Sequence, residues 1–230
     1  MEHMNVPRRS TLQQETLADK IYRTVRARLQ RGEIQATERL LDYEIAEQFG
    51  CTRMPVRQAL VRLASESHLQ RTTRGFVIPR LSDTEVRELF ELRRLLEPYA
   101  AALATALLSA AQTKALSQAH KDAVAAAAKG DAAKVCDANV RFRCTWLDAV
   151  PSQRLKATVQ TFSDLAQQVR THTLPLADTQ HVAAELMHAV LLGFQAKNGE
   201  IVRAAMLDWV LKAEAAYFRA VLMSAAVVLG

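Results

Sequence analysis

Residues that make tight turns are scarce in this 230-residue chain, which holds 7 glycines, 6 prolines and only 6% aromatic residues. Sandwiches of short strands need many turns and aromatic side chains. Half of the residues are hydrophobic, and alanine fills much of the second half. We therefore expect a mainly α-helical protein with a substantial core, and we exclude an all-β sandwich and wholesale disorder.

No segment predicts a membrane span or a secretory signal. The longest apolar stretch, 99–111, is too short and too rich in Ala, Ser and Thr to cross a bilayer. The polar N-terminus lacks the apolar centre of a signal peptide. Cys51, Cys136 and Cys144 have no CxxC spacing, so they predict free thiols rather than a disulfide framework or a zinc ribbon. These features predict a cytoplasmic protein.

The charge is unevenly distributed along the chain. Residues 1–80 hold 14 Lys and Arg against 9 Asp and Glu, whereas residues 81–230 hold 16 against 15. A basic N-terminal module is thus joined to a nearly neutral one, and the total charge of +6 predicts an acidic partner.

The first part of the chain predicts short helical elements. Residues 1–11 are polar and are expected to be flexible. Over 16–31, apolar residues recur at every fourth position among arginines, which predicts an amphipathic helix that ends at Gly32. Residues 39–41 are compatible with a short strand.

Two short helices then surround a turn. One is predicted over 43–49 with Asp42 as its N-cap, and the other over 53–65 with Thr52 as its N-cap. Gly50 between them is suited to the left-handed end of the first helix. This is the spacing of a helix-turn-helix.

A β-hairpin is predicted directly after these helices. The runs 69–72 and 76–79 are β-prone and flank a turn at 73–75 that contains a glycine. A hairpin in this position would be the wing of a winged helix.

The second helix of the pair carries the candidate base-reading residues. Arg53 and Arg57 share one face, and a guanidinium can chelate O6 and N7 of guanine in a major groove. Taken alone, a solvated arginine face is an equally good explanation, but the order of elements favours DNA. The predicted DNA-binding set also includes Thr52 for a phosphate, Arg71, Arg74 and Gly75 in the wing, and Arg39, Tyr43 and Met54.

The rest of the chain predicts a helical bundle. Ser82 is an N-cap for a helix over 82–108, which Pro98 should kink or break. Gly, Pro and Asn residues then delimit five further helical patterns, at 110–129, 131–149, 152–172, 178–196 and 198–223. We therefore predict two domains, 12–81 and 82–230.

Particular runs resemble a known family. Residues 32–34, 38–41 and 44–60 resemble the winged helix of GntR-family transcription regulators, most specifically in Arg53-Met-Pro-Val-Arg-Gln-Ala-Leu60. The wing run 74–77, Arg-Gly-Phe-Val, also fits. The resemblance covers about residues 12–81 and implies binding to double-stranded DNA.

A second, less motif-rich resemblance covers the helical part. The run 91–98, Glu-Leu-Arg-Arg-Leu-Leu-Glu-Pro, and the all-helical pattern after it look like the FadR-type effector domain, the FCD domain. Six helical segments suit its VanR-like branch. The resemblance implies a domain over 82–230 that binds an effector and forms a homodimer.

The chain departs from this family at the metal site. Many FCD domains hold a divalent metal with an Asp and three His, but here Asn139 and Arg143 stand at the first two ligand positions. The other two fall at Met187 and Trp209 in an ungapped alignment, and a shift of one residue adds only His188. The pattern therefore predicts no metal and no other cofactor. His172, His181 and His188 are interpreted as exposed or core histidines.

An anion is expected in place of the metal. Arg143 and Arg93 are predicted to bind a carboxylate, with Asn139 as a polar partner and Met187 and Trp209 as apolar wall. The alternative is that Arg143 lies on the surface or pairs internally, for instance with Asp137 or Asp148.

Together these features predict a transcription regulator, by family habit a repressor, that binds a palindromic operator as a dimer and responds to a small organic acid. The helix over 82–108 is expected to couple the two domains. An effector-independent DNA-binding dimer stays open as an alternative. An enzyme is not expected, because GxSxG, P-loop and GxGxxG motifs are missing from the sequence.

Overall fold

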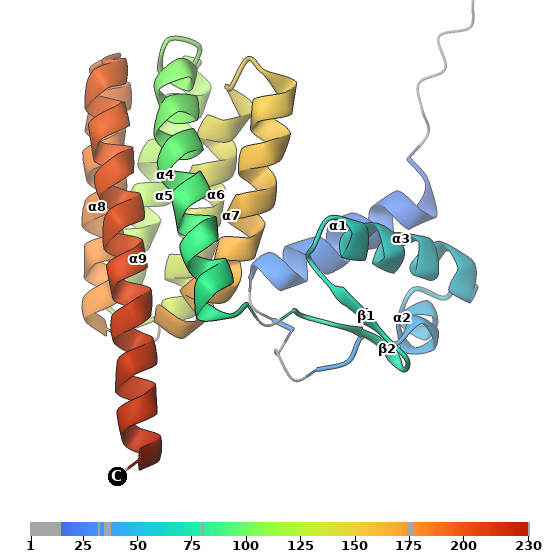
Figure 1. Cartoon of the computed structure of the whole chain (residues 1–230). Coiled ribbons are helices and arrows are strands. Elements are labelled where there is room, and N and C mark those ends of the chain that lie inside the picture. The colour runs from blue at the N-terminus through green and yellow to red at the C-terminus, as the bar shows by residue number, and fades with distance from the viewer. Residues whose placement is uncertain (1–14, 32, 35–37, 80, 174–176, 230) are drawn as a thin grey trace, which may run out of the picture.

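A computed structural model describes residues 15–31, 33–34, 38–79, 81–173 and 177–229, with only the backbone for 167–172, 177 and 224–229. The predicted flexible segment 1–11 lies outside the described residues. A small unit, residues 15–79, which we call the head, lies beside a bundle of longer helices (Figure 1). The predicted fold class, mainly α with a winged helix-turn-helix and a helical bundle, is confirmed.

The head is built on one small core between its helices. Its elements are α1 (Leu17–Gln30), α2 (Asp42–Gln48), α3 (Arg53–Ser65), β1 (Gln70–Thr72) and β2 (Gly75–Val77). The Thr16 hydroxyl accepts a hydrogen bond from the Asp19 amide, and the Asp19 carboxylate accepts one from the Thr16 amide, so a capping box starts α1. Ile21 and Val25 of α1 are buried in the same core as Leu60 of α3.

Two predicted helix caps differ from the observed ones. Helix α2 begins at Asp42 itself with Leu41 at the N-cap position, so the prediction of Asp42 as the cap was wrong. The Asp42 carboxylate instead accepts hydrogen bonds from Arg53. Thr52 occupies the N-cap position of α3 as predicted, but its side chain makes no capping hydrogen bond.

The hairpin is fastened to the loop before α2. β1 and β2 are antiparallel, and the predicted strand over 39–41 is reduced to a bridge in which the Leu40 amide donates to the Phe76 carbonyl at 2.8 Å. Gly75 has a φ of +111°, and a Cβ there would lie 2.7 Å from Leu41 Cδ2 and 2.8 Å from the Leu40 carbonyl oxygen. Only glycine fits this close approach without a shift of the backbone.

Six helices form the described part of the bundle, at nearly the predicted positions. They are α4 (Asp83–Thr105), α5 (Ala110–Ala127), α6 (Ala132–Asp148), α7 (Gln153–Thr173), α8 (Ala177–Gln195) and α9 (Gly199–Leu229). Ser82 caps α4 as predicted, with a capping box to Glu85. Pro98 lies inside α4, so the helix does not break there.

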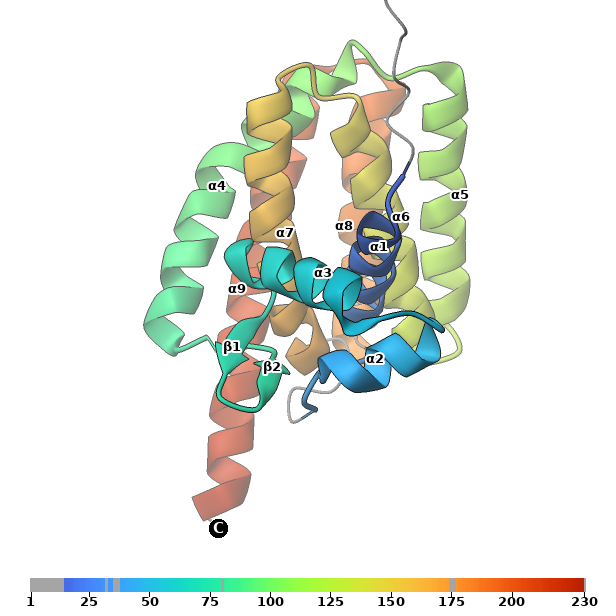
Figure 2. The ribbon, with the colours of Figure 1, turned by 90° about the vertical axis from the view of Figure 1, so that its right-hand side faces the viewer.

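The head contacts the bundle through α1 and α7. Figure 2 views the molecule with the head in front of the bundle. Each unit has its own cluster of buried apolar side chains, one around Leu60 and Leu63, the other around Phe142, Trp146 and Met206. The helices that the structure describes include none that is long and apolar enough to cross a membrane.

Candidate functional site

The start of α3 exposes the residues predicted to read bases. Arg57 and Met54 project from the first turns of α3 and are exposed. Arg53 is exposed as well, but its Nη2 lies 2.7 Å from Asp42 Oδ1, so α2 holds this guanidinium in place. Arg57 has no such partner among the ion pairs of the described residues.

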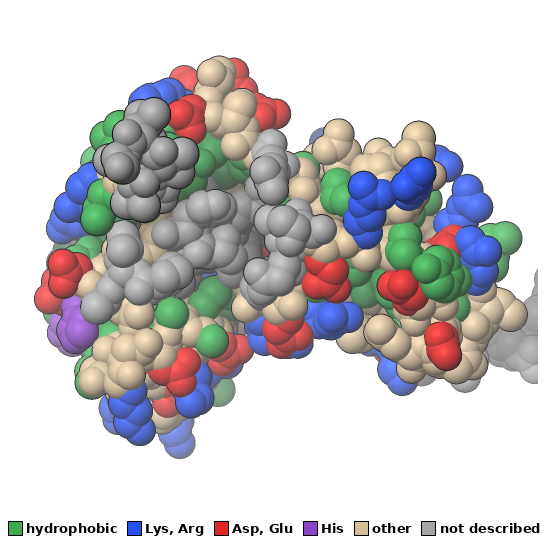
Figure 3. Space-filling view, turned by 90° about the horizontal axis from the view of Figure 1, so that it is seen from below, with side chains coloured by type: hydrophobic (Ala, Val, Ile, Leu, Met, Phe, Trp, Pro, Cys, Tyr) green, Lys and Arg blue, Asp and Glu red, His purple; other side chains and the backbone are tan. Residues whose placement is uncertain are grey.

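The remaining predicted DNA-binding residues surround α3. Arg39, Tyr43 and Thr52 are exposed on or beside α2 and the turn, and Arg71 and Arg74 are exposed on the hairpin. Gly75 is half-buried and shapes the hairpin rather than offering a side chain. Seen from below, basic side chains gather along one side of the head with acidic ones next to them (Figure 3).

A second site is a small cavity inside the bundle, with a volume of about 50 Å³. Arg93, Asn139, Arg143 and Trp209 all line it, from α4, α6 and α9. Met187 is fully buried in the apolar core and is not among the lining residues described. Most of the remaining wall is apolar: Ala166, Val182, Ala183, Leu186, Ala213 and Ala216, with Thr173, Thr179 and Lys212.

Sequence reasoning missed Glu97, which joins the two predicted arginines. Arg93 Nε donates to Glu97 Oε1 and Arg143 Nη1 donates to Glu97 Oε2, each at 2.7 Å. Arg143 Nη1 also donates to Ser163 Oγ at 3.2 Å. The three charged residues are no more than 5% exposed. The i, i+4 spacing of Arg93 and Glu97 on one helix was the available signal.

The electrostatics of this cluster favour an ionised Glu97. Burial opposes ionisation, but Arg143 and Arg93 outweigh it and lower the pKa of Glu97 to about 2. The alternative that Arg143 pairs internally is therefore observed, with Glu97 as the partner. Of the two acids suggested for that role, Asp137 pairs with Arg141 and Asp148 pairs with Lys156.

Two polar atoms in the cavity wall have no hydrogen-bond partner among the described residues. They are Asn139 Oδ1, an acceptor, and Arg143 Nε, a donor. The two side chains are one turn apart on α6, and both are at least 95% buried. The Trp209 ring lies 5.9 Å from the Arg143 guanidinium. Because unpaired buried polar groups are costly, this pair suits a ligand with complementary polar atoms.

The histidines form a different, shallow hollow on the bundle. The rings of His120 and His188 stack with centroids 4.9 Å apart, and His181 lines the same hollow. Burial and the neighbouring His188 lower the pKa of His120. The side chain of His172 lies outside the described residues. Within the described part of the chain, no three His, Cys, Asp or Glu side chains are grouped to hold a metal ion.

Comparison with protein families assigns both units. Residues 88–210 match the FCD domain, and residues 17–78 match the family described as bacterial regulatory proteins, gntR family. The FCD match alone covers more than half of the chain.

Two characterised relatives share part of the sequence. The HTH-type transcriptional regulator McbR of Escherichia coli is 27% identical over 139 residues, which are 60% of this chain and 63% of McbR. The gluconate operon transcriptional repressor of Bacillus subtilis is 35% identical over 75 residues, or 33% of this chain and 31% of the repressor. The chain therefore spans less than two thirds of either relative.

Solved structures share the fold. Escherichia coli McbR/YncC superposes with a TM-score of 0.80 at 23% identity, covering 90% of this chain and 99% of that one. A putative GntR regulator from Rhodococcus sp. RHA1 gives 0.73 at 18% identity, covering 87% and 97%.

Proposed function

The chain belongs to the GntR family of bacterial regulatory proteins and carries an FCD domain, and we propose that a small monocarboxylate in the bundle cavity sets its affinity for an operator. The family matches identify a transcriptional regulator rather than an enzyme. We assign DNA binding to residues 12–81 and effector binding to 82–230, with repression as the output. The B. subtilis relative is itself a repressor by name.

The unpaired atoms of Asn139 and Arg143 carry the effector part of the proposal. Asn139 Oδ1 is an acceptor and Arg143 Nε a donor, both lie in the wall of the cavity, and neither has a hydrogen-bond partner among the described residues. A carboxylate oxygen satisfies the donor, and a hydroxyl on the neighbouring carbon satisfies the acceptor. A 2-hydroxy acid is therefore the simplest ligand that completes both groups. The apolar wall accommodates its short carbon chain.

The charge balance favours a single negative charge on the ligand. Arg93 and Arg143 contribute two positive charges and Glu97 removes one, so the buried cluster has a net charge of +1. Lys212 at the rim is exposed and pairs with Asp208 at 2.8 Å, so its charge is already balanced. An ion of one negative charge neutralises the buried site, whereas a dianion leaves an uncompensated charge.

The head supports the DNA-binding part of the proposal. Arg57, Arg53 and Met54 are exposed at the start of α3, and Arg71 and Arg74 are exposed on the wing. We propose that α3 enters the major groove while the wing arginines contact phosphates. One head offers a small interface, so we expect a homodimer on a palindromic site in the cytoplasm.

Thermal unfolding in the presence of small acids tests the effector. The probes are 2-hydroxypropanoate, propanoate and succinate, each with and without EDTA. Binding to the folded state raises Tm, and we expect the largest rise from 2-hydroxypropanoate, unchanged by EDTA. The rise should disappear in Asn139→Leu and Arg143→Gln.

Arg141→Gln is the matched control, since Arg141 lies on α6 two residues from Arg143 but is exposed and pairs with Asp137 and Asp122. This variant should keep the full response. A response that EDTA abolishes contradicts a metal-free site. No response to any acid in the wild type would support the effector-independent DNA-binding dimer instead.

A further inference from the structure

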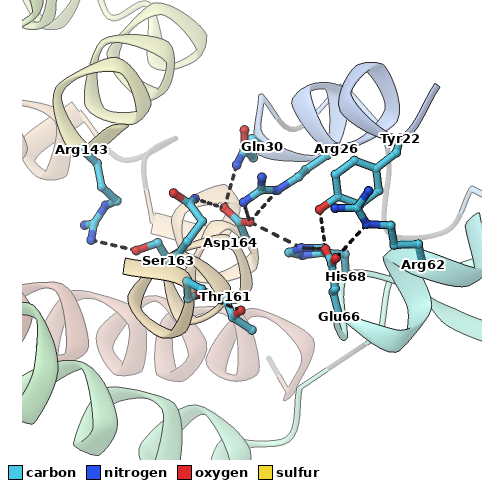
Figure 4. A network of polar contacts seen from close by, with 12 residues as sticks. Tyr22, Arg26, Gln30, Arg62, Glu66, His68, Arg143, Thr161, Ser163 and Asp164 are labelled. Atoms are coloured by element: carbon cyan, nitrogen blue, oxygen red, sulfur yellow. Dashed lines mark hydrogen bonds and ion pairs between the residues drawn. The ribbon is translucent and has the colours of Figure 1, made fainter. Parts of the chain in front are cut away.

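Asp164 of α7 is a carboxylate buried between the bundle and the head. Its side chain is 5% exposed. Oδ2 accepts a hydrogen bond from Arg26 Nε at 2.9 Å, and Oδ1 accepts one from Gln30 Nε2 at 2.7 Å, both from α1 of the head (Figure 4). Gln160, one turn earlier on α7, also donates to Oδ1 at 2.8 Å. Three side chains, two from α1 and one from α7, thus donate hydrogen bonds to this carboxylate.

The head extends this contact through a second group of polar side chains. His68, which follows α3, has its Nε2 at 3.5 Å from both Asp164 Oδ2 and Glu66 Oε2. Glu66 in turn accepts a hydrogen bond from the Tyr22 hydroxyl. A buried carboxylate needs partners, and the head supplies its only cationic one among the described ion pairs, Arg26, with His68 beside it. The position of the head therefore determines whether Asp164 has a cationic partner.

The residue before Asp164 reaches in the opposite direction, into the bundle. Ser163 is 1% exposed, and its Oγ accepts a hydrogen bond from Arg143, whose Nη1 also binds Glu97. Arg143 lines the effector cavity. Two consecutive residues of α7 thus connect the cavity to the head (Figure 4).

We propose that the Ser163–Asp164 pair transmits occupancy of the cavity to the DNA-binding head, an inference that rests on the proposed effector site. An anion bound at Arg143 draws its guanidinium toward the cavity and away from Ser163. The turn of α7 that carries Ser163 then shifts, and Asp164 shifts with it relative to Arg26 and Gln30. Because a packed interface has discrete arrangements, a small shift of this turn repositions the whole head.

This proposal gives α7 a role that the sequence suggested for the helix over 82–108, which is α4. Helix α4 lines the cavity through Arg93 and carries Glu97, as expected for a coupling element. The ion pairs and side-chain hydrogen bonds described between the bundle and the head, however, come from α7 and from Cys136 of α6, whose Sγ lies 3.8 Å from the Gln30 carbonyl oxygen.

Amide hydrogen exchange of the full-length protein tests the connection without any ligand. The reporter is the C-terminal half of α1, which includes Arg26 and Gln30. The internal reference is α3, which packs within the head on α1, α2 and β1. Asp164→Asn should speed exchange in the reporter at least fivefold relative to α3, because the buried charge that holds Arg26 is lost. Ser163→Ala should change the reporter in the same direction.

Asp122→Asn is the matched control. Asp122 is the carboxylate partner of Arg141 within the bundle, and its removal breaks an exposed α5–α6 ion pair without touching the head. The reporter should not change in this variant. Unchanged reporter exchange in both Asp164→Asn and Ser163→Ala overturns the proposal.

A second arm adds 2-hydroxypropanoate and separates this inference from the proposed function. In the wild type the acid should change reporter exchange, whereas in Ser163→Ala it should still raise Tm but leave the reporter unchanged. An acid that raises the wild-type Tm without changing the reporter overturns the coupling. A third outcome is that the acid leaves the wild-type Tm unchanged while Asp164→Asn and Ser163→Ala still speed reporter exchange without ligand. This result contradicts the proposed effector site but supports the connection through α7.

Discussion

Glu97 is the side chain on which the chemistry of the cavity depends. It is 1% exposed and bonds to both Arg93 and Arg143, so its charge sets the net charge of the site. Its effect on stability follows from its pKa, which is lowered from 4.5 to about 2 in the folded protein. An acid with a lowered folded pKa stabilises the fold above the unfolded pKa and loses that contribution as pH falls toward the folded one.

We expect stability to fall between about pH 4.5 and pH 2 by an amount on the order of 3 kcal/mol from Glu97 alone. Urea unfolding over this range measures the change. Other carboxylates also contribute to acid unfolding, so the wild type is compared with Glu97→Gln. In this variant, the part of the decrease in the free energy of unfolding that comes from Glu97 should vanish. Glu88→Gln, an exposed acid on the same helix, should retain it.

The same variant changes which ligands fit. Glu97→Gln raises the net charge of the buried cluster from +1 to +2, so the affinity for a dianion increases relative to the affinity for a monoanion. We expect the affinity ratio of succinate to propanoate to rise about tenfold, which corresponds to about 1.4 kcal/mol. Isothermal titration of both acids measures the ratio. An unchanged ratio would contradict an effector site at these arginines.

The two kinds of arginine in the head should behave differently on DNA. Arg57→Ala should weaken binding to a selected operator by about 1–3 kcal/mol and relax preference at one base pair, since this exposed residue is assigned to base reading. Arg74→Ala in the wing should weaken binding to all DNA sequences alike. It should also reduce the slope of the logarithm of the binding constant against the logarithm of the salt concentration by about 1. Fluorescence anisotropy at several salt concentrations distinguishes them, and Arg154→Ala, exposed on α7 of the bundle, is the control.

The sequence predicted most of the cavity-lining residues that it named, but it did not predict the partners of the two arginines. Arg93, Asn139, Arg143 and Trp209 all line the cavity. Asn139 and Arg143 share a face because they are four residues apart on α6, whereas Trp209 was placed by the resemblance to the family's metal ligands. Met187 lies deeper, in the core. Ser163 and Asp164 were missed because their partners lie on other elements, and pairing between helices depends on their relative rotation. A shift of one residue moves a side chain by about 100° around a helix. Glu97 was missed although its spacing from Arg93 on α4 was visible in the sequence.

The elements themselves were largely predictable. N-cap residues such as Thr52 and Ser82, together with turn residues, placed most helix boundaries within a few residues, since each is a local signal. Asp42 was misassigned because its carboxylate serves Arg53 rather than its own helix, which is a tertiary contact. Pro98 does not break α4, because the packing of α4 against α9 outweighs a local breaker.

The wing depends on one glycine. At Gly75 a Cβ would meet Leu41 and the Leu40 carbonyl at less than 3 Å, and φ is +111°. Gly75→Ala should destabilise the head by about 1–3 kcal/mol through the strained backbone conformation alone. The clash of the added Cβ with Leu41 and the Leu40 carbonyl should destabilise it further. Gly130→Ala is the control, since Gly130 also has a positive φ but nothing within 4 Å, and it should cost about 1–2 kcal/mol. Chemical denaturation compares the two, and equal costs would argue against the close approach.

The placement of the head against the bundle could not be predicted from the sequence. The contact of α1 with α7 joins residues about 140 positions apart, and it depends on polar pairing at Asp164 that no local pattern records. The predicted coupling helix, α4, was chosen by its neighbourhood in sequence, whereas the described polar contacts to the head come from elements that follow it.

A dimer on a palindrome predicts how binding depends on the DNA. A full operator with two half-sites should bind two chains, with an affinity at least a hundredfold above that of a duplex carrying one half-site, because the second contact is intramolecular. Sedimentation of the complex gives the stoichiometry. Equal affinity for the half-site and the full site would show that each chain acts alone.

The narrow junction at Ser163 and Asp164 also bears on engineering this protein as a biosensor. A chimera that replaces residues 15–79 with the head of a relative would retain its response to ligand only if the incoming head carried Arg26, Gln30 and His68, the side chains that face Asp164. Conversely, the lining of the cavity can be redesigned for a new analyte on α8 and α9, while Arg143 of α6 is kept because it contacts Ser163. In this proposal the ligand cavity and the DNA-binding head can be exchanged separately, because the turn of α7 that carries Ser163 and Asp164 connects them.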